Sequence, residues 1–360
     1  MNSTTTTANP LAAALAGAQD ATDVAPNADT RGPIRMGFWV LIVGFGLFLA
    51  WAAWAPLDEG VAAPATVSVA TRRHTIQHMQ GGVIALVFAW LLGPRFGKYN
   101  KDGSVNPLPA HNVPLVILGT FILAFCWFSF NAGSSLAGTD LRIAVAATNT
   151  MLASATAAMA TTLYMWWFKT KKPDPTMMCN GLLAGLVAIT APCAFVDSVG
   201  ACIIGLVAGV LVVESVFFFD KRGIDDPVGA ISVHGVNGAW GCLSLGLFAD
   251  GVYGEGWNGT AGKVVGLFYG GGASQLLAQT IGVVSCFIIT GLLSVIVYKI
   301  VTLLSGGTQR PTEAIEMEGS DIPEMGVHGY HGFVMDKDSE TPMPHGTSHN
   351  APSKPEVAKV

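Results

Sequence analysis

Long apolar runs alternate with short polar connections along most of the chain. Runs near the roughly 20 apolar residues that a membrane-crossing helix needs lie at 36–55, 112–134, 142–168, 177–219, 227–250 and 276–304. The run 177–219 has room for two helices and is interrupted between Pro192 and Asp197. The pattern therefore predicts about seven crossing helices, with the shorter run 79–93 as an eighth candidate.

The segments outside these runs are more polar. Residues 1–35 and the end of the tail 305–360 have the composition of disordered chain. Within 56–77, valines and alanines recur with a period near two, which predicts a short extended segment in water. We therefore expect an anchor helix and this segment over 36–84, followed by a transmembrane domain over 79–304.

Composition supports a membrane protein and narrows its functions. Hydrophobic residues make up 51% and charged residues 12% of the chain, and the mean hydropathy is +0.49. A net charge of -5 favours no nucleic-acid partner. The six cysteines show no CxxC pair and no Cys/His metal spacing, so we expect buried thiols, no metal and no cofactor. No catalytic set of residues stands out, so we do not expect an enzyme.

Lysine and arginine gather in alternate connections, which predicts the orientation in the membrane. The basic loops contain Arg95, Lys98 and Lys101, then Lys169, Lys171 and Lys172, then Lys221 and Arg222. We expect these loops, and both chain termini, to lie in the cytoplasm of a multi-pass protein of the cell inner membrane. This parity requires the run 79–93 to cross as well.

His234 is the most informative single residue, because it lies inside an uncharged run long enough to cross a bilayer. A titratable side chain at that depth is costly and usually faces a pore, a partner or a substrate. A neutral imidazole can accept one hydrogen bond and donate another, so it can hold or pass a proton. The alternative is a histidine hydrogen-bonded to a neighbouring helix.

Three acidic positions have structural explanations. Asp225 and Asp226 precede Pro227, an order typical of a helix start, where carboxylates accept from free N–H groups. Asp197 is expected in a turn between helices. Glu214 lies in an apolar run, and we expect it to face another helix or subunit, because exposure to lipid would be costly.

An aromatic and hydroxyl cluster closes the run 112–134, with Trp127, Phe130 and Ser134 in close succession. Aromatic faces attract cations, and a hydroxyl oxygen can accept a hydrogen bond from an ammonium-like donor. The alternative is an ordinary interfacial aromatic belt. His78 opens the run 79–93 and, taken alone, is typical of an exposed loop residue.

Together these stretches resemble the ammonium transporter (Amt/Rh) family, over about 78–330. The motifs that carry the resemblance are Trp127-Phe-x-Phe130-Asn-Ala-Gly-Ser134, Asn149-Thr150, Gly181-x-x-Ala-Gly-Leu-Val, Thr190-Ala-Pro192, Asp225-Asp226-Pro227 and Val233-His234-Gly235-Val236. The resemblance implies an all-α polytopic bundle that forms a homotrimer with an apolar pore in each subunit. It also implies that the tail near 321–330 can meet a PII-type signalling protein.

The same resemblance assigns roles to individual residues. It implies that His234 and His78 form the pore histidine pair, and that Phe130 gates the outer mouth. Trp127 and Ser134 fall beside Phe130 at the ammonium recruitment site. Ammonium would lose water and a proton there, and ammonia would cross the apolar section, whereas potassium would be rejected by its dehydration cost. Set against the family pattern, we expect the first four helices and part of the fifth to be absent from this chain.

A second resemblance covers about 30–84. Its motifs are Leu57-Asp-Glu-Gly-Val-Ala-Ala-Pro and Arg72-Arg-His-Thr-Ile-Gln-His78-Met-Gln-Gly-Gly82-Val, which are similar to the start of the periplasmic adaptor proteins of type I secretion (membrane fusion, HlyD-like). The two patterns coincide at 78–84, so we expect a chimeric join there, either a natural fusion, a recombined gene or an artefact.

The sequence thus predicts an ammonium/ammonia transporter for nitrogen uptake. We expect a partial family bundle that follows an extra N-terminal anchor helix. We expect its transport to be defective because the bundle is truncated. The alternative is a non-transporting membrane protein, in which a secretion-adaptor anchor is fused to a transporter remnant. Ammonium flux measurements separate the two.

Overall fold

The computed structural model describes most of the chain from residue 72 onward. The described residues are Val43, 72–135, 138–257, 260–307, 309–327, 333–335 and 342–344. The chain divides into the units Met1–Thr66 and Val67–Val360, and every element below belongs to the second unit. The predicted disordered segment 1–35 and anchor helix 36–55 lie outside the described residues, apart from Val43.

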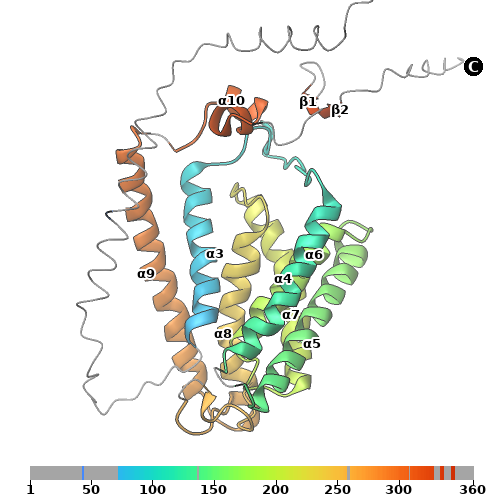
Figure 1. The fold of residues 1–360 in the computed structure, drawn as a ribbon, viewed down its shortest axis with the longest axis vertical. Helices are drawn as coiled ribbons and strands as arrows, with labels where there is room; N and C mark the ends of the chain where they lie inside the picture. The colour runs from blue at the N-terminus through green and yellow to red at the C-terminus, as the bar shows by residue number, and fades with distance from the viewer. Residues whose placement is uncertain are drawn as a thin grey trace, which may run out of the picture. The chain divides into compact units, whose positions relative to one another are not determined.

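Long helices dominate the described part of the chain (Figure 1), and their bounds follow the predicted apolar runs. The α-helices are α3 (Arg72–Leu92), α4 (Val113–Gly133), α5 (Arg142–Tyr164), α6 (Pro175–Thr190), α7 (Ser198–Lys221), α8 (Asn237–Phe248), α9 (Ser274–Leu304) and α10 (Glu313–Glu318). The shorter elements are the π-helices η1 (Met165–Lys169), η2 (Ile231–Val236) and η5 (Asp321–Met325), the 3-10 helix η4 (Leu267–Tyr269) and the strands β1 (Phe333–Met335) and β2 (Pro342–Pro344).

The prediction of a helical polytopic membrane protein is confirmed. Within the described residues, the helices long and apolar enough to span a membrane are Val113–Gly133, Arg142–Lys169, Ser198–Lys221 and Ser274–Leu304, with Gln77–Leu92 and Pro175–Thr190 as shorter apolar helices. The predicted break between Pro192 and Asp197 is also confirmed, because α6 ends at Thr190 and α7 begins at Ser198.

Local sequence explains where three of these helices begin. Asn112, Asp174 and Asp197 each accept a backbone N–H of the following first turn with their side chains. Proline occupies the first turn of α4 and α6, where its missing N–H and fixed φ cost nothing. The predicted place of Asp197 between two helices is therefore that of a helix cap.

Two expectations need correction. The prediction of an extended segment over 56–77 is wrong for its last residues, because α3 already begins at Arg72. The valine alternation lies within 56–71, which is outside the described residues. The predicted disordered end of the tail contains Pro342–Pro344, which pairs antiparallel with Phe333–Met335. The expected join at 78–84 falls inside the continuous helix α3.

Small residues let the helices of the bundle pack closely. A Cβ added to Gly185 would lie 2.5 Å from the Ala153 carbonyl oxygen, and one added to Gly209 would lie 2.4 Å from the Ala157 carbonyl oxygen. The glycines therefore bring α6 and α7 against α5, which is a typical way for membrane helices to associate. On the other side of the bundle α3 contacts α8, η2 and α9 (Figure 1).

Candidate pore wall around the histidine pair

The backbones of α3 and η2 touch, and glycines make this contact possible. A Cβ added to Gly82 would lie 2.0 Å from the Gly235 amide nitrogen and 2.3 Å from its Cα. A Cβ added to Gly238 would lie 3.0 Å from the Met79 amide nitrogen. No side chain fits between the helices at Gly82, so the residues flanking this contact are held close to each other.

His78 and His234 are the side chains that this contact brings together. Their ring centroids are 5.4 Å apart and their planes are inclined by only 14°. His234 lies in η2, whose wider turn changes the register of the run predicted over 227–250. Asn237 compensates for part of this local change, because its Nδ2 donates to the Ser232 carbonyl oxygen at 2.9 Å.

Aromatic rings from α4 complete the group. The Trp127 ring stacks on His78 with centroids 4.8 Å apart and planes 16° apart, while Phe130 meets His78 edge-on at 6.2 Å. Trp127 is itself fixed, since its Nε1 donates to the buried Thr190 Oγ1 at 2.9 Å. Residues from α3, α4 and η2, far apart in the sequence, therefore form one continuous ring cluster.

Ser134 is one turn beyond Phe130, at the C-terminal end of α4. Its Oγ donates to the Phe130 carbonyl oxygen at 2.8 Å, as expected for a serine that closes a helix. The donation occupies the hydroxyl hydrogen, while an oxygen lone pair can still accept from another donor. The structure thus places an acceptor and an aromatic face at the same end of α4.

Comparison with known proteins shows the family of this chain. A model of the Ammonium Transporter Family matches residues 34–330, which is most of the chain. The chain belongs to the ammonium transporter family. The match begins upstream of 78, so it includes the stretch 34–84 in which we also noted an adaptor resemblance; that resemblance stays a prediction.

Curated relatives include the ammonium transporter Amt2 of Archaeoglobus fulgidus, 42% identical over 269 residues, with 75% of this chain and 56% of the relative covered. Ammonium transporter Amt1 of Haloferax mediterranei is 37% identical over 276 residues, covering 72% of this chain and 49% of the relative. The chain thus spans about half the length of the curated relatives it matches.

Solved structures are also similar to this chain. A "Sensor Amt Protein" aligns with a TM-score of 0.62 and 35% identity, covering 70% of this chain and 58% of that one. Mep2 of Candida albicans aligns with a TM-score of 0.59 and 28% identity, covering 69% of this chain and 54% of that one. The helical arrangement is therefore that of the ammonium transporter family.

The partner of Asp225 differs from the predicted one. Its position before Pro227 predicted that it would accept from the free N–H groups of a helix start, but in the structure it binds an arginine. Arg95 donates to its carboxylate through Nε at 2.7 Å and Nη2 at 2.9 Å, and through its backbone amide at 2.9 Å. Burial acts to raise the pKa of Asp225, but the hydrogen bonds and the charge of Arg95 outweigh it, so the pKa is lowered. Asp225 therefore joins the loop after α3 to the segment before η2.

Asp226 is the residue that caps the following helix. Its carboxylate accepts from the Ala230 amide at 2.9 Å and from the Ile231 amide at 2.7 Å. Pro227 lies in a turn and not in the first helical turn, so the predicted helix start is about one turn too early. Burial raises the pKa of Asp226, while the backbone N–H donors act against it.

Glu214 faces another helix, in line with its expected position. The Tyr164 hydroxyl donates to its carboxylate, and Lys169 Nζ lies 2.7 Å from the same oxygen. Both partners come from the end of α5 and from η1, which contact α7 here. Glu214 therefore joins the second half of α7 to the end of α5 and to η1.

Two buried asparagines, Asn149 and Asn131, hold helices together. In the sequence they were recognised only as parts of the family motifs. Asn149 donates to the carbonyl oxygens of Cys193 at 2.9 Å and Val196 at 2.7 Å, and Asn131 donates to Thr150 Oγ1 at 2.9 Å. Asn149 thereby satisfies backbone carbonyls of the turn between α6 and α7, and Asn131 joins α4 to α5; both side chains are buried. Their occurrence inside apolar runs was the sequence signal that could have indicated this structural role.

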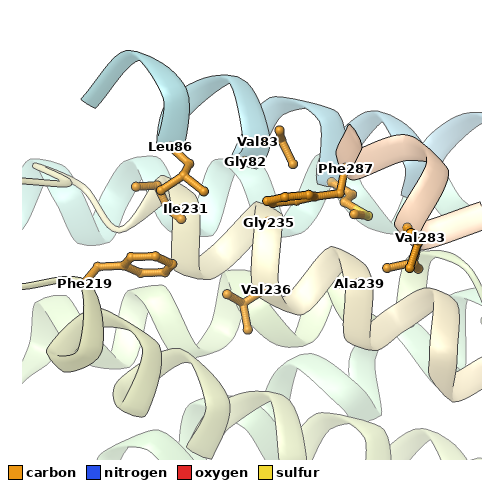
Figure 2. A pocket seen from close by; sticks show the side chains of 12 residues that line it. Gly82, Val83, Leu86, Phe219, Ile231, Gly235, Val236, Ala239, Val283 and Phe287 are labelled. Carbon is orange, nitrogen blue, oxygen red and sulfur yellow. The ribbon is translucent and has the colours of Figure 1, made fainter. Parts of the chain in front are cut away.

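An apolar cavity of about 390 Å³ lies at the contact between α3 and η2, where Gly82 and Gly235 line it (Figure 2). Its walls come from α3, η2, α8 and α9 and from the end of α7, and they include Gly82, Val83, Phe219, Gly235 and Phe287. The histidine side chains do not belong to its lining. Among the described residues, no group of three or more His, Cys, Asp or Glu side chains could hold a metal ion.

Proposed function

We propose that this chain transports ammonium and ammonia across a membrane, with ammonium losing its proton at an outer aromatic site and ammonia passing the histidine pair. Family membership supports the substrate, because the curated relatives are named ammonium transporters. The stacked rings of His78 and His234, 5.4 Å apart, support the path. This juxtaposition is the observation that carries the proposal.

The proposed recruitment site uses Trp127, Phe130 and Ser134. Ring faces attract a cation, and the serine oxygen can accept from one of its N–H groups. Phe130 is 40% exposed, whereas Trp127 is 8% exposed, so Phe130 can meet an incoming cation while Trp127 supports His78 from behind. Ammonia then needs only weak polar partners, which a pair of neutral imidazoles supplies.

We further propose that the chain forms a homotrimer in the cell inner membrane, with both termini on the cytoplasmic side. We also propose a role in nitrogen uptake and a PII-type partner at the tail near 321–330. The chain spans about half the length of the curated relatives it matches, and we propose that the described residues supply one wall of the path. We therefore expect its flux to be lower than that of a full-length relative.

Ammonium-induced pH change in proteoliposomes tests the proposal. The chain should give flux above empty liposomes, and His234→Ala should abolish that flux. His111→Ala, a histidine in the exposed loop before α4, is the matched control and should leave flux unchanged. No flux above empty liposomes from a folded chain would overturn transport and favour the non-transporting alternative. Equal flux from His234→Ala would overturn the path.

A further inference from the structure

The π-helix η2 carries His234 and is closed at its end by Asn237. In a π-helix the backbone hydrogen bonds reach five residues back, which gives a wider turn than an α-helix has. The Asn237 backbone amide donates to the carbonyl oxygens of Ser232 and His234. His234 therefore lies inside the turn that this one residue closes.

The Asn237 side chain binds the same carbonyl group as its backbone. Its Nδ2 donates at 2.9 Å to the Ser232 carbonyl oxygen, which also accepts from the Asn237 backbone amide. A carbonyl oxygen has two lone pairs, so Asn237 can occupy both of them. The contact that defines the wide turn is thus made twice, and we name this double contact the Asn237 clamp.

One atom of the clamp is destabilising. Asn237 is fully buried, and its Oδ1 has no hydrogen-bond partner among the described residues. An unpaired buried acceptor lowers the stability of a fold, and a leucine would give the same branched shape without it. The amide is therefore better explained by the local geometry of η2 than by a contribution to stability.

Other contacts hold both flanks of η2. On one side Asp226 accepts from the first amide of η2 at 2.7 Å, and on the other side Trp240 donates to a carbonyl oxygen of α7 at 3.1 Å. If the wide turn were lost, the change in register would be taken up between these contacts, where His234 lies. One residue of helical register corresponds to a rotation of about 100°, which is enough to turn the His234 ring away from His78.

We propose that Asn237 is a positioning residue for transport. Through the Asn237 clamp it holds η2 in its wide form and thereby sets the ring of His234 against that of His78, with the ring centroids 5.4 Å apart. Asn237 acts through the backbone, because its side chain does not line the apolar cavity, whereas the neighbouring Val236 does. The inference rests on the proposed path of ammonia past the histidine pair.

Asn237→Leu tests the positioning role in proteoliposomes, with Ser232→Ala as the matched control. Asn237→Leu keeps a branched side chain but removes the donor, and it should lower ammonium flux about tenfold, as expected when a functional group is displaced. The ratio of methylammonium to ammonium flux should change as well. Ser232→Ala removes a buried hydroxyl that is unpartnered within the described part of the chain, but it keeps the carbonyl group. It should leave both fluxes unchanged.

The unfolding midpoint in sodium dodecyl sulfate separates positioning from stability. Because Asn237→Leu removes an unpaired buried acceptor, its midpoint should equal or exceed that of the unsubstituted chain. A lower midpoint together with an equal fall in both fluxes would mean a purely structural role and would overturn the inference. Unchanged flux in Asn237→Leu, from a chain that transports, would overturn it too.

Nitrogen NMR of histidine-labelled chain reads the ring positions without any flux. The signals of the His234 ring, assigned by their loss in His234→Ala, should shift in Asn237→Leu and stay in place in Ser232→Ala. Unchanged signals in Asn237→Leu would overturn the positioning role. Absence of flux from the unsubstituted chain would instead overturn the proposed function, and these signals would still decide whether Asn237 positions His234.

Discussion

Gly82→Ala gives the sharpest test of how the histidine pair is held. The added Cβ would meet the Gly235 amide nitrogen at 2.0 Å and the His234 carbonyl carbon at 2.8 Å, where ordinary contact begins at 3.4 Å. Both are backbone atoms, so no side-chain rotation relieves the overlap. The helices α3 and η2 must therefore move apart, and the two imidazole rings move with them.

The magnitude follows from two opposing effects. Overpacking of a close contact typically costs about 1–3 kcal/mol, whereas Gly→Ala inside a helix gains roughly 0.5–1 kcal/mol. We therefore expect Gly82→Ala to lower the free energy of unfolding by about 1–2 kcal/mol, since the overlap here is with rigid backbone. Ammonium flux should fall as well.

Gly81 supplies a matched control on the same helix, because a Cβ added there meets nothing within 4 Å. Gly81→Ala should leave the unfolding free energy unchanged or raise it. Unfolding in mixed micelles with increasing sodium dodecyl sulfate, followed by tryptophan fluorescence, compares the two variants. If Gly82→Ala is as stable as Gly81→Ala, the close contact between α3 and η2 is wrong.

The remaining predictions concern polar contacts around this wall. Arg95→Gln leaves the carboxylate of Asp225, whose side chain is 2% exposed, without its ion pair; we expect a loss of about 1–3 kcal/mol of unfolding free energy, discounted because Arg95 is partly exposed. Because the pKa of Asp225 is lowered, the stabilisation by this pair is complete above its ordinary pKa of about 3.9 and is lost as pH falls through the lowered pKa. Acid titration of unfolding should therefore show a steep loss below about pH 4 that Arg95→Gln lacks, and the same acid slope in both proteins would contradict the assignment. Trp127→Phe removes the donor to Thr190 Oγ1 and should lower the free energy of unfolding by about 1–3 kcal/mol, measured by the same unfolding titration. Trp167→Phe, at an exposed ring, is its control. An equal effect of both substitutions would refute the role of this hydrogen bond.

The sequence predicted the helices well because membrane spans depend on local properties. An apolar run of sufficient length must satisfy its backbone within itself, so it forms a helix wherever it occurs. The break between Pro192 and Asp197 was visible for the same local reason, since proline and a capping aspartate end one helix and start another. The helix order and most bounds followed from these rules.

What the sequence did not predict depends on distant residues. η2 replaces the expected helix start after Pro227, and its position is tied to the contact between Gly82 and Gly235. Asp225 binds Arg95, which lies 130 positions away, so no local rule could reveal that Asp225 joins two loops instead of capping a helix. Likewise, the stacking of the Trp127 ring on His78 was not predicted, because the two residues lie on different helices far apart in the sequence.

The geometry of the histidine pair depends mainly on the backbone around it. A stacked pair of aromatic rings contributes only about 0.5–1.5 kcal/mol beyond its buried area, which is too little to set the position of α3 against η2. The contact of Gly82 with Gly235 fixes the middle of α3 against η2. The hydrogen bonds of Arg95 to Asp225 fix the loop after α3 to the segment just before η2. These two contacts together hold the rings of His78 and His234 beside each other. Replacing one histidine should consequently change the chemistry of the wall while leaving its shape intact.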